Sequence, residues 1–321
     1  MTGETRSGIG VAGLGSALPP TVAEAVSTGS GPSAESGLFS GARSRRVLAD
    51  GEAIEDLAVS ACRGALEEAG VRVDEIDSLY GYITVSEFLS PNGLFRVHRD
   101  LGLGSHALVV PVNCEFGTFV MALALAWESM RAGRFTHALV SVGTNWSRHV
   151  DARNPHAGMI GDGAGAAVLR RSERMVIVDW IHETRSTEYG AMTMAVRRDA
   201  GDTGDTVRPV YRIEPDAGVG AFRSTGMDGP PDLIRRLLGR HGIDLGEVTV
   251  IGHQASDVLL EHWRDLLRPA RYHDTLSDYG NLTIASAAVT LAAAADVVDT
   301  PYLVLFGVGI GSYQIALLIR R

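Results

Sequence analysis

The chain has 321 residues, of which 45% are hydrophobic and 21% are charged, and its formal net charge is −9 at pH 7. This acidic balance argues against a general nucleic-acid-binding protein, which normally carries a basic excess. The sequence contains no run of about 18 apolar residues that could span a membrane. Its start lacks the basic segment and apolar core of a signal peptide, and two cysteines cannot build a disulfide framework. We therefore expect a globular protein of the cytoplasm.

Short β-branched segments alternate with alanine-rich segments of helical periodicity, which is typical of an α/β fold. Residues 107–112 have the composition of a strand but contain Pro111, which indicates a sheet edge or a bulge. Residues 182–228 are polar and weakly periodic, so we expect loops there with one helix. Other strands are predicted over 8–13, 78–85, 136–143, 166–169, 175–179, 248–251, 302–306 and 313–319, and helices over 52–70, 116–131, 231–245, 256–267 and 285–297.

The alternation of strands and helices starts again after Arg170 and Arg171. We place a boundary near Ser172, which divides the chain into an N-terminal half, 1–172, and a C-terminal half, 173–321. The length of the chain suits either two domains or one large domain built from two halves.

Cys114 stands where a predicted buried strand meets the start of an apolar helix. The N-terminus of a helix favours a thiolate, which lowers the pKa of such a cysteine and makes it a nucleophile. A buried structural cysteine is the alternative interpretation, and this position alone does not decide between the two. Cys62 lies inside the regular helix predicted over 52–70, and we predict that it is a core residue.

Two polar residues of the second half stand at the ends of predicted elements. His253 follows the strand predicted over 248–251, and clefts form at the carboxyl ends of strands in α/β sheets. A hydrogen-bonded structural histidine is the alternative. Asn281 stands just before a predicted helix, where an N-cap is an equally good explanation.

The segment Gly8-Ile-Gly-Val-Ala-Gly13 matches the dinucleotide-binding fingerprint G-x-G-x-x-G in its letters. The fingerprint requires a strand before it and a helix after it, with an acidic residue about 20 positions further on. Here only seven residues precede Gly8, and Pro19-Pro20 follows the expected start of the helix. The ten histidines show no metal-binding spacing with cysteines. We therefore expect neither a nicotinamide site nor a metal site.

Five motifs occur in a fixed order: Cys114 at a helix start, GDGAGA at 161–166, HQA at 253–255, YGN at 279–281 and a glycine-rich loop at 307–311. Together they resemble the β-ketoacyl-ACP synthase III branch of the thiolase superfamily over nearly the whole chain. The resemblance implies a thiolase-like five-layer αβαβα fold made of two similar halves. It also implies a homodimer, with Cys114 in the first half, His253 and Asn281 in the second, and no bound cofactor.

The resemblance further implies covalent acyl transfer. Cys114 takes an acyl group from an acyl-carrier protein or CoA thioester, and the backbone N–H groups of Cys114 and Val308 form the oxyanion hole. His253 and Asn281 bind the thioester carbonyl of a malonyl unit while it loses CO₂, and the enolate then attacks the acyl group. The substrate pocket implied in this way contains Leu89, Ser90, Leu94 and Phe306, together with the segment 182–228.

Several positions depart from the pattern of this branch. Glu115 and Phe116 replace the small residues that usually follow the nucleophile, Val308 replaces a glycine, and Ser256 replaces the asparagine that usually ends the HQAN motif. The tryptophan that ordinarily stacks on the CoA adenine is missing from the segment before Gly41. These departures put recognition of CoA thioesters in question.

The helix after His253 carries charges of both signs. Relatives carry basic side chains there, which meet an acidic carrier protein through complementary charge. Three arginines of the preceding helix are the candidates to replace them, although an ordinary solvated face is the preferred interpretation: Arg235, Arg236 and Arg240.

Three functions are compatible with this sequence. The preferred one is a ketosynthase III-like acyltransferase that passes the acyl group to a malonyl-derived carbon, in secondary metabolism of the polyketide or fatty-acid type. The alternative is transfer without decarboxylation to a hydroxyl or amine of a natural product, for which His253 would serve as general base. A catalytically silent partner subunit is the third, and the presence of Cys114, His253 and Asn281 argues against it.

Overall fold

The computed structural model describes residues 7–25, 39–151, 154–198, 207–311 and 313–321. Within these residues one large mixed sheet has ten strands in the order β12-β11-β13-β14-β8-β1-β7-β6-β4-β5. The first half contributes β1 (Gly8–Ala17), β4 (Ser78–Thr84), β5 (Leu108–Pro111), β6 (Ala138–Thr144) and β7 (Gly163–Ser172). The second half contributes β8 (Val176–Thr184), β11 (Val248–Gly252), β12 (Arg271–His273), β13 (Tyr302–Gly309) and β14 (Tyr313–Arg320).

The two halves repeat one pattern of strand pairing. In the first half, β1-β7-β6 are antiparallel neighbours and β6-β4-β5 are parallel neighbours. In the second half, β8-β14-β13 are antiparallel and β13-β11-β12 are parallel. The halves join where Gly10 of β1 pairs with Val176 of β8. The prediction of two similar halves is confirmed, and the predicted boundary, Ser172, is the last residue of β7.

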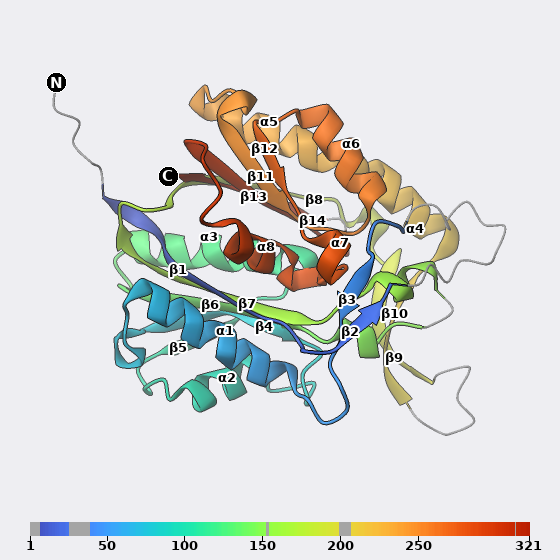
Figure 1. The fold of residues 1–321 in the computed structure, drawn as a ribbon, viewed down its shortest axis with the longest axis horizontal. Helices are drawn as coiled ribbons and strands as arrows, with labels where there is room; N and C mark the ends of the chain where they lie inside the picture. Colours follow the sequence, from blue (N-terminus) through green and yellow to red (C-terminus); the bar gives the residue numbers. More distant parts are fainter. Residues whose placement is uncertain (1–6, 26–38, 152–153, 199–206, 312) are drawn as a thin grey trace.

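Helices form three layers around the two halves of the sheet (Figure 1). Helices α1 (Ile54–Ala69) and α2 (Leu94–Leu101) cover the outer face of the first half, and α5 (Gly229–His241) and α6 (Asp257–Leu267) cover that of the second. Helices α3 (Thr118–Arg131) and α8 (Ser286–Ala294) lie between the two halves. The predicted five-layer αβαβα fold is therefore confirmed.

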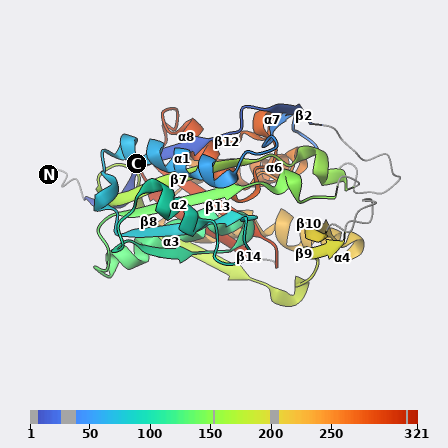
Figure 2. The same cartoon turned by 90° about the horizontal axis from the view of Figure 1, so that it is seen from below.

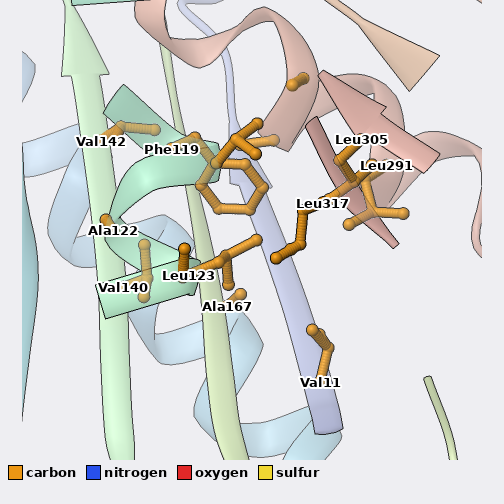
Figure 3. Close-up of a cluster of buried hydrophobic side chains, with 14 of the residues drawn as sticks. Val11, Phe119, Ala122, Leu123, Val140, Val142, Ala167, Leu291, Leu305 and Leu317 are labelled. Carbon is orange, nitrogen blue, oxygen red and sulfur yellow. The ribbon is translucent and has the colours of Figure 1, made fainter. Parts of the chain in front are cut away.

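The central layer contains the largest hydrophobic core. Phe119 and Leu123 of α3 pack with Leu291 of α8, and side chains from both halves of the sheet complete the cluster (Figure 3). A helix that is apolar on nearly all sides must be buried on all sides, and α3 meets this condition because both halves of the sheet contact it. The start of α3, just after Cys114, is thereby held at a set position between the halves.

The dinucleotide-like segment lies inside a single strand, since β1 continues to Ala17 without a following helix. Its glycines have a packing role. A Cβ atom on Gly13 would lie 2.2 Å from the carbonyl oxygen of Ala65, and one on Gly15 would lie 2.0 Å from that of Ala61. The absence of side chains at these two positions lets α1 pack directly on β1. Cys62 of the same helix is fully buried, as predicted.

The prediction of loops over 182–228 is wrong in part. This segment contains the antiparallel hairpin of β9 (Met192–Arg198) and β10 (Val207–Ile213), followed by α4 (Pro215–Ala221) and a π-helical turn over Phe222–Met227. Figure 2 shows β9, β10 and α4 together at one end of the molecule. The hairpin depends on tertiary contacts, because Tyr211 packs on Trp146 and pairs with Val150. The periodicity of the local sequence does not indicate such contacts.

The remaining elements are short. Strands β2 (Val22–Glu24) and β3 (Ser44–Arg46) pair with each other, and α7 (Leu276–Tyr279) precedes Asn281. Strand β5 is the outermost strand of the first half, as Pro111 predicted. Across the described part of the chain, no helix combines the length and the apolar character needed to cross a membrane.

The contact between β1 and α1 can be tested by unfolding. We expect Gly15→Ala to destabilise the protein by about 1–3 kcal/mol, because the new methyl group overlaps backbone atoms that cannot move independently. Gly64→Ala is the matched control, because a Cβ atom at position 64 of α1 would lie 3.8 Å from the Cα atom of Gly15, an ordinary van der Waals distance. This substitution should be neutral or should stabilise the protein by up to about 1 kcal/mol. Urea titration followed by circular dichroism measures both, and equal stabilities would contradict this account of the packing.

Candidate active site

Cys114 lies between β5 and a 3₁₀ turn over Glu115–Gly117 that leads into α3. It is partly buried, and its backbone N–H donates a hydrogen bond of 3.0 Å to Thr118 Oγ1. Burial raises the pKa of Cys114, and the neighbouring Glu115 carboxyl raises that pKa further. We expected the helix N-terminus to lower this pKa, and the opposite direction follows from removing the thiolate from water beside an acidic group.

Glu115 has a positive φ of 46°, in the left-handed region that side-chain-bearing residues rarely adopt. Its backbone N–H donates a 3.0 Å hydrogen bond to Asn113 Oδ1. Burial raises the pKa of the Glu115 carboxyl, while a hydrogen bond with the Asn113 side chain opposes this change. Glu115 is therefore turned inward beside the candidate nucleophile.

His253 follows β11 and is 2% exposed. The ring of Phe116 stacks on its imidazole, with ring centroids 4.6 Å apart and planes within 5° of parallel. Burial lowers the pKa of His253 to about 3, although a backbone hydrogen bond at Thr283 opposes this change. The imidazole is consequently neutral at physiological pH, and a neutral imidazole can donate one hydrogen bond to a substrate oxygen.

Asn281 follows α7, and backbone hydrogen bonds fix it to the segment before β7. Its N–H donates to the carbonyl of Met159 over 2.8 Å, and its own carbonyl accepts from Gly161 over 3.0 Å. The side-chain Oδ1 accepts from the N–H of Thr283 over 2.9 Å. This bond makes an Asx-type turn and not the helix N-cap of the alternative interpretation, because Leu282 and Ala285 stand at the N-cap positions of the turn over Thr283–Ala285 and of α8. Because the oxygen is engaged, the amide nitrogen is the group through which Asn281 can hold a ligand.

A cavity of about 90 Å³ lies beside these residues and is lined mainly by apolar groups. His253, Asn281 and Val308, predicted from the sequence, are brought together in its wall. Cys114 is not among the described residues that line it, but Phe116, two positions later, and Gly309 are. Its aromatic and imidazole lining consists of Phe39, Phe116, Trp146, His156, Tyr211 and His253.

Cys114 is nevertheless next to this wall. Its carbonyl oxygen would lie 2.6 Å from a Cβ atom placed on Gly309, so the two backbones are in direct contact. The 3₁₀ turn after Cys114 also contacts both β13 and the turn over Thr283–Ala285. The nucleophile segment of the first half thus meets the His253 and Asn281 segments of the second half at one place.

The four residues predicted to form the substrate pocket lie elsewhere. Phe306 is 1% exposed and packs edge-on against Trp263, with ring centroids 5.1 Å apart. Leu94 is fully buried in the core under α1 and α2, whereas Leu89 is 82% exposed and Ser90 is exposed. None of the four is among the described residues that line the cavity beside His253. Their assignment to a substrate pocket, which came from matched positions, stays a prediction.

The sequence analysis missed Trp146 and His156 of the cavity, whereas Tyr211 lies in the segment 182–228 that it expected to contribute to the substrate pocket. Trp146, His156 and Tyr211 come from three segments and meet through their rings: Trp146 and Tyr211 at 4.6 Å, His156 and Tyr211 at 5.1 Å. Burial lowers the pKa of His156 to about 4, against the opposing charge of Asp151. No motif links these positions, and no sequence signal could have grouped them.

In the described residues no group of three or more His, Cys, Asp or Glu side chains is arranged to hold a metal ion. The three arginines considered for carrier-protein docking have acidic partners. Arg236 bonds to Glu183 at 2.8 Å, Arg240 to Asp179 at 3.4 Å, and Arg235 to Asp232 at 3.5 Å. These pairs match the solvated face that was the preferred interpretation.

The fold is thiolase-like, with two similar halves around a buried helical layer. Residues 112–185, which include Cys114 and the motif at 161–166, match the family model for 3-oxoacyl-[acyl-carrier-protein (ACP)] synthase III. The β-ketoacyl-[acyl-carrier-protein] synthase III of Rubrobacter xylanophilus is 30% identical over 226 residues, covering 69% of this chain and 67% of the relative. That of Gloeobacter violaceus is 29% identical over 262 residues, covering 78% of each chain.

The chain belongs to the β-ketoacyl-ACP synthase III family. Among solved structures, the priming β-ketosynthase from the R1128 polyketide biosynthetic pathway superposes with a TM-score of 0.85 at 24% identity. The alignment covers 100% of this chain and 98% of that one. At this identity the superposition supports the fold, and the family assignment rests on the sequence relatives.

The influence of Glu115 on the nucleophile can be measured directly. We expect Glu115→Gln to increase the rate of Cys114 alkylation by iodoacetamide about threefold to tenfold at pH 7.5, because removal of the acidic group lowers the thiol pKa. The pH profile of alkylation should move to lower pH. Glu67→Gln on the exposed face of α1 is the control, and a profile unchanged by Glu115→Gln would contradict the electrostatic coupling.

Proposed function

We propose that the protein is an acyltransferase that carries its acyl group on Cys114 and passes it to a malonyl-derived carbon. The observation that carries this proposal is the meeting of the Cys114 segment with His253, Asn281 and Val308 beside one cavity. A covalent intermediate divides a difficult transfer into two easier steps. The Cys114 thiolate attacks the carbonyl carbon of an acyl thioester, the C–S bond of the donor breaks, and the donor leaves as a thiolate that takes a proton from solvent.

In the second step, His253 and Asn281 hold the thioester carbonyl of a malonyl unit through hydrogen bonds. As the carboxylate leaves as CO₂, the electron pair moves into an enolate whose oxygen these two donors stabilise. The enolate carbon attacks the acyl carbonyl, the C–S bond breaks, and Cys114 returns as a thiolate. Burial keeps the His253 imidazole neutral, so in this proposal it acts on the thioester oxygen only through the single ring N–H that a neutral imidazole carries.

The oxyanion hole for the acyl group is formed by the N–H groups of Cys114 and Val308 in this proposal. The Cys114 N–H is engaged with Thr118 Oγ1 at 3.0 Å. It must therefore be shared with, or released to, the acyl oxygen when the tetrahedral intermediate forms. Thr118 Oγ1 is thus the group with which the acyl oxygen competes for this donor.

We further propose that the donor is an acyl-carrier protein or CoA thioester, and that the enzyme acts in the cytoplasm in secondary metabolism. The unusual residues Glu115 and Phe116 support a specialised substrate, because they occupy the immediate surroundings of the nucleophile. Transfer to a hydroxyl or amine is the second candidate function. The buried Glu115 carboxyl favours it, and its role is developed below.

Intact-protein mass spectrometry tests the acyl-enzyme. Incubation with a panel of acyl-CoA and acyl-carrier thioesters should add one acyl group to the protein, and Cys114→Ala should abolish the adduct. Malonyl-carrier protein should then discharge it with release of CO₂. Asn281→Ala should still form the adduct but release CO₂ at least about a hundredfold more slowly, in line with the loss of one oxyanion donor.

Other results would redirect the assignment. An adduct that persists with every malonyl donor would point to an oxygen or nitrogen acceptor. Unimpaired turnover by Cys114→Ala would exclude both enzymatic functions, and no adduct from any donor would favour a catalytically silent partner subunit.

We also propose a homodimer that forms along strand β5. This strand is the exposed edge of the sheet, and its Leu108 is 50% exposed. An unpaired edge with apolar side chains is a ready surface for pairing with another chain. The exposed apolar side chains Phe88, Leu89 and Phe95 precede it in the sequence.

Light scattering coupled to size-exclusion chromatography should give twice the chain mass of 34.1 kDa. Leu108→Asp should shift the protein toward the monomer, because a charge on the pairing edge is costly to bury. Val297→Asp is the control, because Val297 follows α8 and is 60% exposed. This variant should keep the mass of the dimer in solution. A monomeric native protein would refute the dimer.

A further inference from the structure

Glu115 is a partly buried acid, and the condensation reaction does not use it. It immediately follows Cys114, and its backbone holds a φ of 46° that is unfavourable for a residue with a side chain. Strained backbone of this kind is concentrated at functional sites, where surrounding structure maintains it. The strain in this chain directs a carboxyl group inward beside the nucleophile.

The Glu115 carboxyl is only partly satisfied. Its Oε2 atom is shielded from solvent and has no hydrogen-bond partner in the described part of the protein. The Asn113 side chain provides a hydrogen bond to the carboxyl. A buried acceptor without a donor is costly, and such an atom in a functional site is ready to accept a proton or a hydrogen bond from a ligand.

Within the described residues, the groups around the carboxyl do not supply that donor. The titratable groups that it influences are Cys114, Tyr82 on β4 and Tyr211 on β10, and its negative charge raises the pKa of each. On β14, the Tyr313 ring lies against Gly117 and is close enough to Cys114 for the two to interact. The Tyr82 phenol has its own hydrogen bonds with Asn113 and Asn92.

Transfer to an O–H or N–H acceptor needs a base, whereas decarboxylation generates its own nucleophile. Efficient general bases have a pKa near the working pH. His253 is poorly matched, because burial lowers its pKa to about 3 and Phe116 covers one face of its ring. Burial changes the pKa of Glu115 in the useful direction, upward. Of these two groups, Glu115 is the better base.

We propose that Glu115 is the general base for transfer of the acyl group from Cys114 to a hydroxyl or amine acceptor, water included. The acceptor oxygen or nitrogen attacks the acyl carbonyl carbon while its proton passes to Glu115 Oε2. The tetrahedral intermediate then collapses, the C–S bond breaks, and the product is an ester, an amide or a free acid. Cys114 leaves as a thiolate, and the proton on Glu115 returns to it or to solvent. The proposal rests on the acyl-Cys114 of the proposed function but not on malonyl condensation.

The test separates acylation from discharge. The native protein, Glu115→Gln, Glu115→Asp and the control Glu67→Gln are acylated with hexanoyl-CoA, freed of excess donor and followed by intact mass in buffer between pH 5 and 9. We expect Glu115→Gln to acylate at least as fast as the native protein but to lose its adduct to water about a hundredfold more slowly at pH 7.5. In Glu115→Gln, the hydrolysis rate should no longer rise with pH as the carboxyl group of the native protein loses its proton. Glu115→Asp should keep part of the native hydrolysis rate.

Hydroxylamine serves as an internal control, because this strong nucleophile cleaves thioesters without a general base. It should discharge the native and Glu115→Gln adducts at similar rates. A slower reaction with both water and hydroxylamine would indicate a distorted site and would overturn the assignment of Glu115 as base. Hydrolysis of the Glu115→Gln adduct at the native rate would overturn it as well, while leaving the acyl-enzyme intact. Absence of any adduct on the native protein, with hexanoyl-CoA and with the whole panel of acyl-CoA and acyl-carrier thioesters, would refute the proposed function itself.

Discussion

The burial of α3 between the two halves of the sheet is the constraint on which the rest of the structure depends. Phe119 and Leu123 give this helix apolar contacts on more than one side, and strands of both halves supply the partners. A helix buried in this way has one low-energy position, because protein interiors are close-packed and tolerate few voids. Cys114 stands just before that helix. Its position relative to His253 and Asn281 is therefore set by the packing of the whole central layer.

The burial of the site then determines the pKa values of its titratable groups. Burial disfavours the charged form of every titratable group, and the consequences differ in sign. It lowers the pKa of His253 and raises those of Cys114 and Glu115. One physical cause thus gives a neutral imidazole that suits hydrogen-bond donation, and a carboxyl group that suits proton transfer. The less acidic thiol is the cost of this arrangement, and Glu115 adds to it.

Phe116 connects these two effects. Its ring stacks on His253 at 4.6 Å and meets Trp146 edge-on at 5.2 Å. Phe116, which comes from the first half, therefore covers the imidazole of His253 in the second half. It is also one of the aromatic residues that line the cavity. A small residue at this position would leave the imidazole more open to water. The surroundings of Cys114 are consequently adapted as a unit, in which position 115 supplies an acid and position 116 an apolar cover.

The sequence by itself determined the architecture and the principal site residues to be considered. Strand and helix periodicity predicted the α/β alternation, Pro111 predicted the edge position of β5, and the order of five motifs predicted the family. These features depend on neighbouring residues or on the order of motifs along the chain, so they can be predicted from a single sequence. It did not determine the β9–β10 hairpin, the turning inward of Glu115, or the lining of the cavity by Trp146 and His156. Only the tertiary structure decided these, because they arise from contacts between segments far apart in the chain, and burial acts on a side chain only after those segments have packed.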